Sequence, residues 1–255
     1  MIDLLIVTGG SKGIGKNIVL NASKCAKKVL AIGSSDFIHD VLDRKKNIYT
    51  IKRDISRIDK DFDELSDFLK KHNPSSIGLA LCASKLGIFG GIAAADFMDW
   101  EKLYRTNVLG NLSVLNNILK FANINTFIRV IFFGGGGAAY GYPDFPGYSL
   151  SKVAVVRAVE NIGIEFKKDY KNASIIALAP GAVKSTDMFA TVESHGAVQK
   201  TRTSIDEPTN FVSNFILDKI PSIKLNGCFV HVRDDLEKYF QEELDENHFK
   251  LRRID

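Results

Sequence analysis

The sequence predicts a doubly wound α/β fold, in which helices cover both faces of a mostly parallel sheet. Short apolar runs alternate with longer amphipathic stretches, and this alternation continues along almost all of the 255 residues. No long Gly/Ser/Pro linker, repeat or low-complexity tract interrupts it. Alternation of this kind is typical of βαβ units, whose right-handed crossovers place helices on both faces of the sheet. We therefore expect one domain spanning residues 1–255.

The elements follow from local pattern. Six short apolar runs are expected to be strands: Leu4–Val7, Val29–Ile32, Ile48–Ile51, Ile77–Leu81, Arg129–Phe133 and Ser174–Ala179. Four stretches with apolar residues spaced by about 3.6 are expected to be helices: Gly15–Lys27, Asp59–Lys71, Phe97–Phe121 and Ser149–Lys168. A break is expected within the longest, Phe97–Phe121. The polar segment Lys184–Glu207 has little periodicity, so it is either a lid over a substrate or an exposed loop.

Composition narrows the class of partner. The 34 Lys and Arg are spread among 30 Asp and Glu, which favours a solvated surface over a nucleic-acid interface. The three cysteines lie far apart with no metal-like spacing, so we expect a reduced, cytoplasmic setting and no metal site. The N-terminal residues carry no pattern of a leader or of a membrane span, so no membrane association is expected.

A glycine-rich turn follows the first expected strand and opens a helix. It reads Thr8-Gly9-Gly10-Ser11-Lys12-Gly13-Ile14-Gly15. Glycines let the backbone approach a pyrophosphate, and the helix N-terminus offers free N–H groups and partial positive charge to it. We therefore expect a dinucleotide to contact this turn through Gly9, Ser11, Lys12, Gly13, Ile14 and Gly15.

The tip of the second strand indicates which dinucleotide is preferred. Gly33-Ser34-Ser35 stands where an acidic residue would bind the adenosine ribose of NAD. Ser34, Ser35 and Lys12 can instead hold a ribose phosphate, which favours NADP. Asp36 follows directly, and a shift of one residue in the alignment would place its carboxylate near the ribose, so NAD stays an alternative.

The turn, together with Tyr148-Ser149-Leu150-Ser151-Lys152, resembles the TGxxxGxG and YxxxK motifs of the classical short-chain dehydrogenase/reductase family. The resemblance covers most of the chain and implies a Rossmann-type fold, a homodimer or homotetramer, and an asparagine in a proton relay at Asn107. It also implies cofactor contacts at Asp54 and Ile55 beside the adenine, at Ala83, and at Pro180, Gly181, Val183 and Ser185 or Thr186 on the nicotinamide side. Around Ala83 the match is degenerate, because both asparagines and the glycine of the family's NNAG segment are missing.

Tyr148 and Lys152 are four residues apart and so share one face of a helix. A tyrosine titrates near pH 10 in water, and an adjacent ammonium together with an oxidised nicotinamide favours its phenolate form. Tyr148 can then exchange a proton at neutral pH, while Lys152 would also bind the nicotinamide ribose. Taken alone, the pair is better interpreted as a tyrosine and a lysine on a helix surface; the glycine turn, Asn107 and Pro180-Gly181 favour the catalytic interpretation.

The family's catalytic serine has no counterpart here. No Ser or Thr occurs between Thr126 and Ser149, and Gly134 or Gly135 stands in its place. Loss of one donor to a developing oxyanion commonly costs about 3–4 kcal/mol. The backbone of Gly134–Gly137, the Tyr140 hydroxyl or the substrate itself could replace this donor, or the glycines could simply form a turn. The aromatic loop Tyr140–Phe145 could stack on a substrate ring or only pack locally.

Two functions follow from these residues. The first is an NADP-preferring oxidoreductase that transfers hydride between the nicotinamide and a small carbonyl or alcohol substrate, with Tyr148 as acid/base, supported by Lys152 and Asn107. The second is a nucleotide-binding regulator or scaffold of the same fold that does little chemistry, which the glycine at the serine position motivates.

Overall fold

The computed structural model describes residues 1–36, 47–196 and 202–251. Its strands form one sheet in the order β3-β2-β1-β4-β5-β6-β7, and every neighbouring pair is parallel. The strands are β1 (Ile2–Thr8), β2 (Ala26–Gly33), β3 (Ile48–Lys52), β4 (Ser76–Leu81), β5 (Phe127–Phe133), β6 (Ala173–Ala179) and β7 (Phe229–His231). The predicted doubly wound fold is therefore confirmed.

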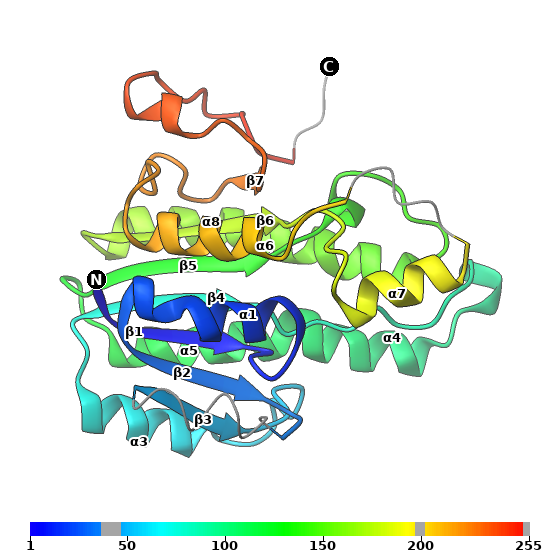
Figure 1. Cartoon of the computed structure of the whole chain (residues 1–255), viewed down its shortest axis with the longest axis horizontal. Helices are drawn as coiled ribbons and strands as arrows, with labels where there is room; N and C mark the ends of the chain where they lie inside the picture. The colour runs from blue at the N-terminus through cyan, green and yellow to red at the C-terminus, as the bar shows by residue number, and fades with distance from the viewer. Residues whose placement is uncertain (37–46, 197–201, 252–255) are drawn as a thin grey trace.

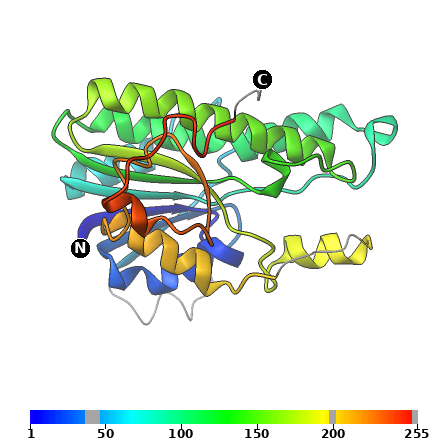
Figure 2. The same cartoon turned by 90° about the horizontal axis from the view of Figure 1, so that it is seen from above.

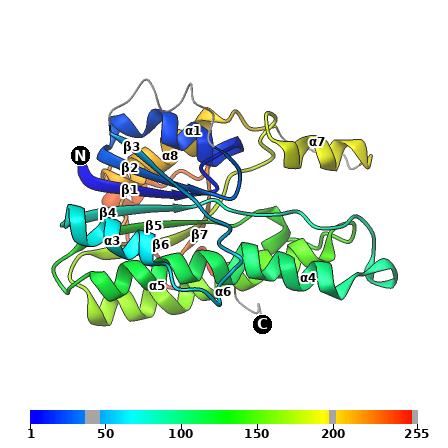
Figure 3. The ribbon, with the colours of Figure 1, turned by 90° about the horizontal axis from the view of Figure 1, so that it is seen from below.

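The helices cover both faces of this sheet. α1 (Gly13–Asn21) and α8 (Asp206–Ile216) pack on one face, and α3 (Asp63–His72), α5 (Asn111–Phe121) and α6 (Pro146–Asp169) pack on the other, as Figures 2 and 3 show. Central strand β1 contributes to both cores by alternation. Leu5 and Val7 pack with the first group of helices, and Leu4 and Ile6 with the second.

The strand order creates a crevice at one end of the sheet. From β1 the chain proceeds through β2 to β3, and then returns to the other side of β1 to form β4. The loops that follow β1 and β4 therefore diverge at the carboxyl ends of the strands, which is where open α/β sheets bind ligands. Figure 1 shows this end on the same side as α4 (Phe97–Tyr104) and α7 (Asp187–Ser194).

Two predicted helices differ from those observed. α1 ends at Asn21, and after the short helix η1 (Ala22–Lys24) the residues Ala26 and Lys27, predicted as helical, begin β2. Pairing with β1, in the register Ile2↔Ala26, outweighs their local helical pattern. The long stretch Phe97–Phe121 contains no break; α4 continues through a π-helical segment, η3 (Arg105–Gly110), into α5.

The remaining elements lie outside the predictions. β7 and α8 were not anticipated, and neither were the short helices η2 (Ile92–Ala94), η4 (Gly136–Ala138) and η5 (Glu237–Phe240). Within Lys184–Glu207 the structure places α7 and the start of α8, while residues 197–201 lie outside the described residues. A lid role for this segment stays a prediction. Across the described ranges, no helix is long and apolar enough to cross a membrane.

Candidate functional site

A cavity of about 520 Å³ opens at the carboxyl ends of the strands. It brings together predicted residues from all parts of the chain: Gly9, Ser11, Lys12, Gly13, Ile14, Gly15, Ser34, Ser35, Asp54, Ile55, Ala83, Tyr148, Lys152, Pro180 and Ser185. Three other predicted residues, Asn107, Gly181 and Val183, lie outside its lining. The cavity wall also contains residues that the sequence did not single out: Arg53, Cys82, Ser84, Lys85, Thr106, Phe133, Met188 and Thr191.

The glycine turn has the close packing that a phosphate-binding turn requires. A Cβ at Gly15 would lie 2.3 Å from the carbonyl oxygen of Gly9, and one at Gly9 would lie 3.0 Å from the Cα of Ala83. Gly9 also has a φ of 66°, which favours glycine. Lys12 occupies the N-cap of α1 without a side-chain capping bond, so the helix N-terminus faces the cavity with free N–H groups. These residues fit the pyrophosphate of a dinucleotide.

The tips of β2 and β3 form the end of the cavity where the adenosine would lie. Ser34 and Ser35 line it, and Arg53 joins them because its backbone N–H donates to the Gly33 carbonyl at 2.8 Å. Asp36 is not part of the lining. It is 86% exposed and accepts a hydrogen bond from Lys52 Nζ at 2.6 Å. No carboxylate from the tip of β2 therefore faces the cavity, and its side chains there are hydroxyls.

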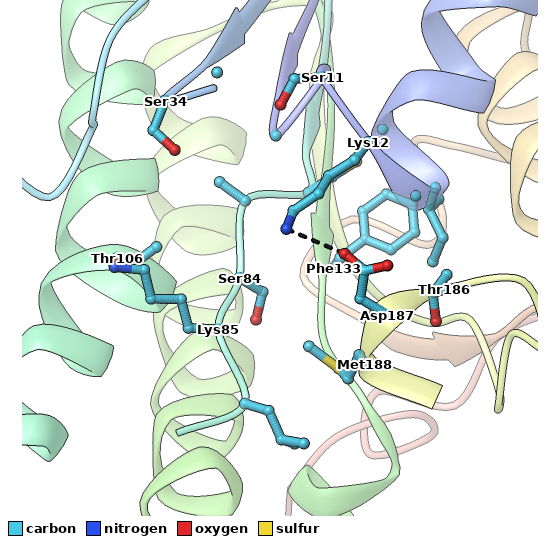
Figure 4. A pocket seen from close by; sticks show the side chains of 18 of the residues that line it. Ser11, Lys12, Ser34, Ser84, Lys85, Thr106, Phe133, Thr186, Asp187 and Met188 are labelled. Carbon is cyan, nitrogen blue, oxygen red and sulfur yellow. Dashed lines mark hydrogen bonds and ion pairs between the residues drawn. The ribbon is translucent and has the colours of Figure 1, made fainter. Parts of the chain in front are cut away.

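Lys12 extends toward α7. Its Nζ lies 3.2 Å from Asp187 Oδ2 across the cavity, as the dashed line in Figure 4 shows. Both side chains are mostly exposed, so this ion pair contributes little to stability. The lysine predicted to bind phosphate is thus within reach of the first turn of α7.

Asn111 compensates for the degenerate segment after β4. It is fully buried on α5, and its Oδ1 accepts a hydrogen bond from Thr8 Oγ1 at 2.6 Å. Its Nδ2 donates to the Ala83 carbonyl at 2.9 Å, while the Ala83 N–H donates to Thr8 Oγ1 at 3.1 Å. Asn111 and Thr8 together fix the Ala83 backbone beside the glycine turn, although both asparagines expected there are missing.

Asn107 lies in the π-helical segment η3 and is fully buried. Its side chain accepts from the Lys85 N–H at 2.7 Å and donates to the Lys85 carbonyl at 2.9 Å and to Ser151 Oγ at 3.0 Å. The asparagine therefore joins the loop after β4 to α6, one residue before Lys152. Its predicted place in a proton relay stays a prediction.

Tyr148 and Lys152 lie on the buried face of α6, and both line the cavity. Lys152 Nζ donates to the Phe133 carbonyl at 2.8 Å and lies 5.4 Å from the centre of the Tyr148 ring. Burial lowers the pKa of Lys152 to about 8. Burial, reinforced by nearby Tyr142, raises the pKa of Tyr148 well above its ordinary value. In the absence of cofactor, burial therefore favours the protonated hydroxyl, and the shift of Tyr148 toward phenolate with an oxidised nicotinamide bound stays a prediction.

The two glycines considered for the place of the missing serine face different neighbours. A Cβ at Gly134 would point away from Tyr148 and meet the Phe229 ring at 3.2 Å, whereas one at Gly135 would lie 2.9 Å from the Tyr148 hydroxyl oxygen. Gly135 is thus the residue that faces the tyrosine, and a side chain there requires Tyr148 to move. Tyr140, considered as a substitute donor, is 79% exposed and is absent from the cavity lining.

An apolar cluster surrounds the tyrosine. Leu103, Phe145, Tyr148 and Val192 are buried together, with Leu86, Tyr104, Tyr142 and Met188 packed against them. The segment Lys184–Glu207 joins this cluster through Met188 and Val192, and the His195 ring lies 6.1 Å from the Phe145 ring between centroids. The aromatic loop Tyr140–Phe145 therefore packs locally through Tyr142 and Phe145. Among the residues that the structure describes, no cluster of His, Cys, Asp and Glu suited to a metal occurs.

Comparison with known proteins agrees with this geometry. The family model for short chain dehydrogenase matches residues 3–196. Benzil reductase ((S)-benzoin forming) of Saccharomyces cerevisiae is 23% identical over 91% of this chain and 96% of its own length. A xylitol dehydrogenase structure with bound NAD+ superimposes with a TM-score of 0.77 at 16% identity, covering 90% of this chain and 96% of its own. A short chain dehydrogenase of Escherichia coli complexed with NADPH has a TM-score of 0.74 at 16% identity, covering 91% and 97%. The chain therefore belongs to the classical short-chain dehydrogenase/reductase family and is an NAD(P)-dependent oxidoreductase.

Proposed function

We propose that this protein is an NADP-preferring reductase that reduces the carbonyl group of an apolar, ring-bearing substrate, with Tyr148 as the proton donor. The observation that carries the proposal is the placement of Tyr148 and Lys152, from α6, in the same cavity as the glycine turn. The nicotinamide cofactor would supply the hydride. The protein's own residues would bind the cofactor, orient the carbonyl and provide the proton.

The protonation state of Tyr148 favours the direction of reduction. Its raised pKa keeps the hydroxyl protonated at neutral pH, so that it can donate a proton to a carbonyl oxygen that has accepted hydride. Lys152 is held in place by the Phe133 carbonyl, and its lowered pKa of about 8 keeps most of its charge at pH 7. That charge, adjacent to the tyrosine ring, stabilises the phenolate that remains after proton transfer.

The preference for NADP rests on the side chains at the tip of β2. Ser34 and Ser35 offer two hydroxyls at this end of the cavity, whereas the guanidinium of Arg53 is already bound to Glu64 and to the Lys60 carbonyl. A phosphate on the adenosine ribose needs such donors, whereas NAD needs a carboxylate to accept from its ribose hydroxyls. Asp36, the alternative acceptor, is outside the lining and paired with Lys52.

The substrate class follows from the cluster around Tyr148. Leu86 and Met188, which pack against the cluster around Tyr148, give the cavity an apolar surface, whereas Tyr142 and the buried Phe145 lie outside its lining. Such a surface binds rings and alkyl groups better than it binds sugars or charged acids. The yeast relative, whose name states that it reduces benzil, supports testing aromatic diketones first.

The proposal is tested by following NADPH oxidation by the purified protein across a panel of carbonyls. We expect turnover with benzil and other apolar ketones, and a much lower rate with hydroxylated or carboxylated carbonyls of similar size. A preference for NADH, or a preference for polar substrates, would contradict the corresponding part of the proposal.

The nucleotide-binding regulator or scaffold remains the second candidate, because Gly135 offers no side-chain hydroxyl beside Tyr148. Tight NADPH binding without turnover on any carbonyl, together with recovery of a protein partner, would favour it. A cytoplasmic setting and a homodimer or homotetramer stay predictions, and sedimentation of the purified chain tests the second of these.

A further inference from the structure

We propose that Ser84 is a cofactor-binding residue, whose hydroxyl forms a hydrogen bond with the ribose that carries the nicotinamide. The family segment that Ser84 belongs to has glycine at the corresponding place, so this contact would be a property of this chain. The proposal assumes that a nicotinamide dinucleotide fills the cavity, but it does not depend on turnover by Tyr148.

The hydroxyl of Ser84 is buried and has no hydrogen-bond partner. Within the described ranges, no other buried side-chain nitrogen or oxygen is in this condition. Buried hydroxyls normally have a partner, because an unpaired one forfeits its hydrogen bonds to water. Ser84 belongs to the cavity wall, and Figure 4 shows its side chain projecting from the loop after β4. Rotation about one bond between staggered positions is enough to direct this hydroxyl toward a ligand.

The residues on both sides of Ser84 are fixed. The Ala83 N–H and carbonyl are bound by Thr8 and Asn111, and the Lys85 N–H and carbonyl are both bound by Asn107. The backbone therefore cannot shift to provide Ser84 with a partner from the protein. A ligand in the cavity can supply one.

The threonines on the same wall differ from Ser84. Thr106 Oγ1 donates to the Lys102 carbonyl at 3.1 Å, Thr186 Oγ1 to the Val183 carbonyl at 2.9 Å, and Thr191 Oγ1 to the Asp187 carbonyl at 2.9 Å. Each of these hydroxyls already stabilises its own turn or helix. The Ser84 hydroxyl, unlike these three, is buried and has no partner in the protein.

The position of Ser84 indicates which part of the cofactor it contacts. On one side, Ala83 packs against Gly9 of the phosphate-binding turn. On the other, Lys85 is tied through Asn107 to Ser151, next to Lys152. Ser84 therefore lies between the residues that fit the pyrophosphate and those that face the reacting group. The ribose between pyrophosphate and nicotinamide is the group of a dinucleotide that spans this interval, and its hydroxyls can accept the bond.

The test compares Ser84→Ala with the unaltered protein in calorimetric titrations with three ligands and no carbonyl substrate. NADPH and 2′-phospho-ADP-ribose contain the proposed ribose, and adenosine 2′,5′-bisphosphate lacks it. We expect Ser84→Ala to weaken the first two about three- to tenfold, as for loss of one neutral hydrogen bond, and to leave the third unchanged. Ser34→Ala is the matched control, because it removes a serine hydroxyl at the adenosine end and should weaken all three ligands.

Three outcomes would overturn the proposal. Unchanged affinity for every ligand would mean that the hydroxyl makes no contact, and equal weakening of all three would mean a general effect on the cavity. Weakening of NADPH alone would place the contact on the nicotinamide ring instead of the ribose. Because no step measures turnover, failure of the reductase proposal leaves this result interpretable.

Discussion

The buried charge of Lys152 makes a specific prediction for stability in the absence of cofactor. Burial lowers its pKa from 10.5 to about 8, which corresponds to about 3 kcal/mol of preference for the neutral amine in the folded state. Between these two pH values the unfolded chain holds a proton that the folded chain has lost, so folding becomes more favourable as pH rises. Below pH 8 the buried charge therefore lowers the unfolding free energy by its full amount. This loss becomes smaller as the pH rises and disappears above about 10.5.

Lys152→Met removes the titration while keeping a side chain of similar length. We expect the unfolding free energy of the unaltered protein, minus that of the variant, to rise by about 2.5 kcal/mol between pH 7 and pH 10. The lost hydrogen bond to Phe133 shifts this difference by a constant, because the neutral amine can still donate. Burial raises the pKa values of Cys82 and Tyr148 in the variant as well as in the unaltered protein, so these two groups affect both unfolding free energies.

Urea unfolding at several pH values measures the two free energies. Groups other than Lys152 titrate in both proteins, so their contributions cancel in the difference to first order. A difference that stays constant from pH 7 to pH 10, or that falls, would refute the conclusion that Lys152 is charged and desolvated in the cavity.

Three further predictions concern the cavity wall. Gly135→Ala places a methyl group 2.9 Å from the Tyr148 hydroxyl and should reduce turnover about tenfold or more, while NADPH affinity stays unchanged. Gly136→Ala is the control and should have little effect, because a Cβ there would meet no atom within 4 Å. Asn111→Leu leaves the buried carbonyls of Ala83 and Thr106 without their hydrogen bonds and should lower the unfolding free energy by about 2–4 kcal/mol. If urea unfolding of this variant matched that of the unaltered protein, Asn111 would not stabilise the Ala83 backbone. Ser34→Asp should weaken NADPH at least about tenfold relative to NADH in binding titrations, while Asp36→Asn should leave that ratio unchanged.

The sequence was sufficient to predict every strand of the sheet except β7, and the two ends of the site. Buried parallel strands consist of nearly continuous apolar residues, and the glycine turn and the Tyr148–Lys152 spacing are local patterns that need no tertiary information. Together with the family resemblance, these local signals predicted about half of the residues that line the cavity.

Features that depend on contacts between distant segments were not predictable. The start of β2 at Ala26 is set by pairing with β1, and the π-helical segment at Arg105–Gly110 has no sequence pattern of its own. The role of Asn111 arises only when α5 meets the ends of β1 and β4. Only the direction of a Cβ on the folded backbone distinguishes Gly135 from Gly134 as the residue facing Tyr148.

Tyr148→Phe tests the central claim most directly. This variant removes the proton donor and keeps the buried ring, so carbonyl reduction should fall about a hundredfold or more while the NADPH dissociation constant stays nearly unchanged. Stopped-flow measurement of NADPH oxidation, with titration of NADPH on the same preparation, gives both quantities. Turnover retained by Tyr148→Phe with normal cofactor affinity would contradict the assignment of Tyr148 as the acid.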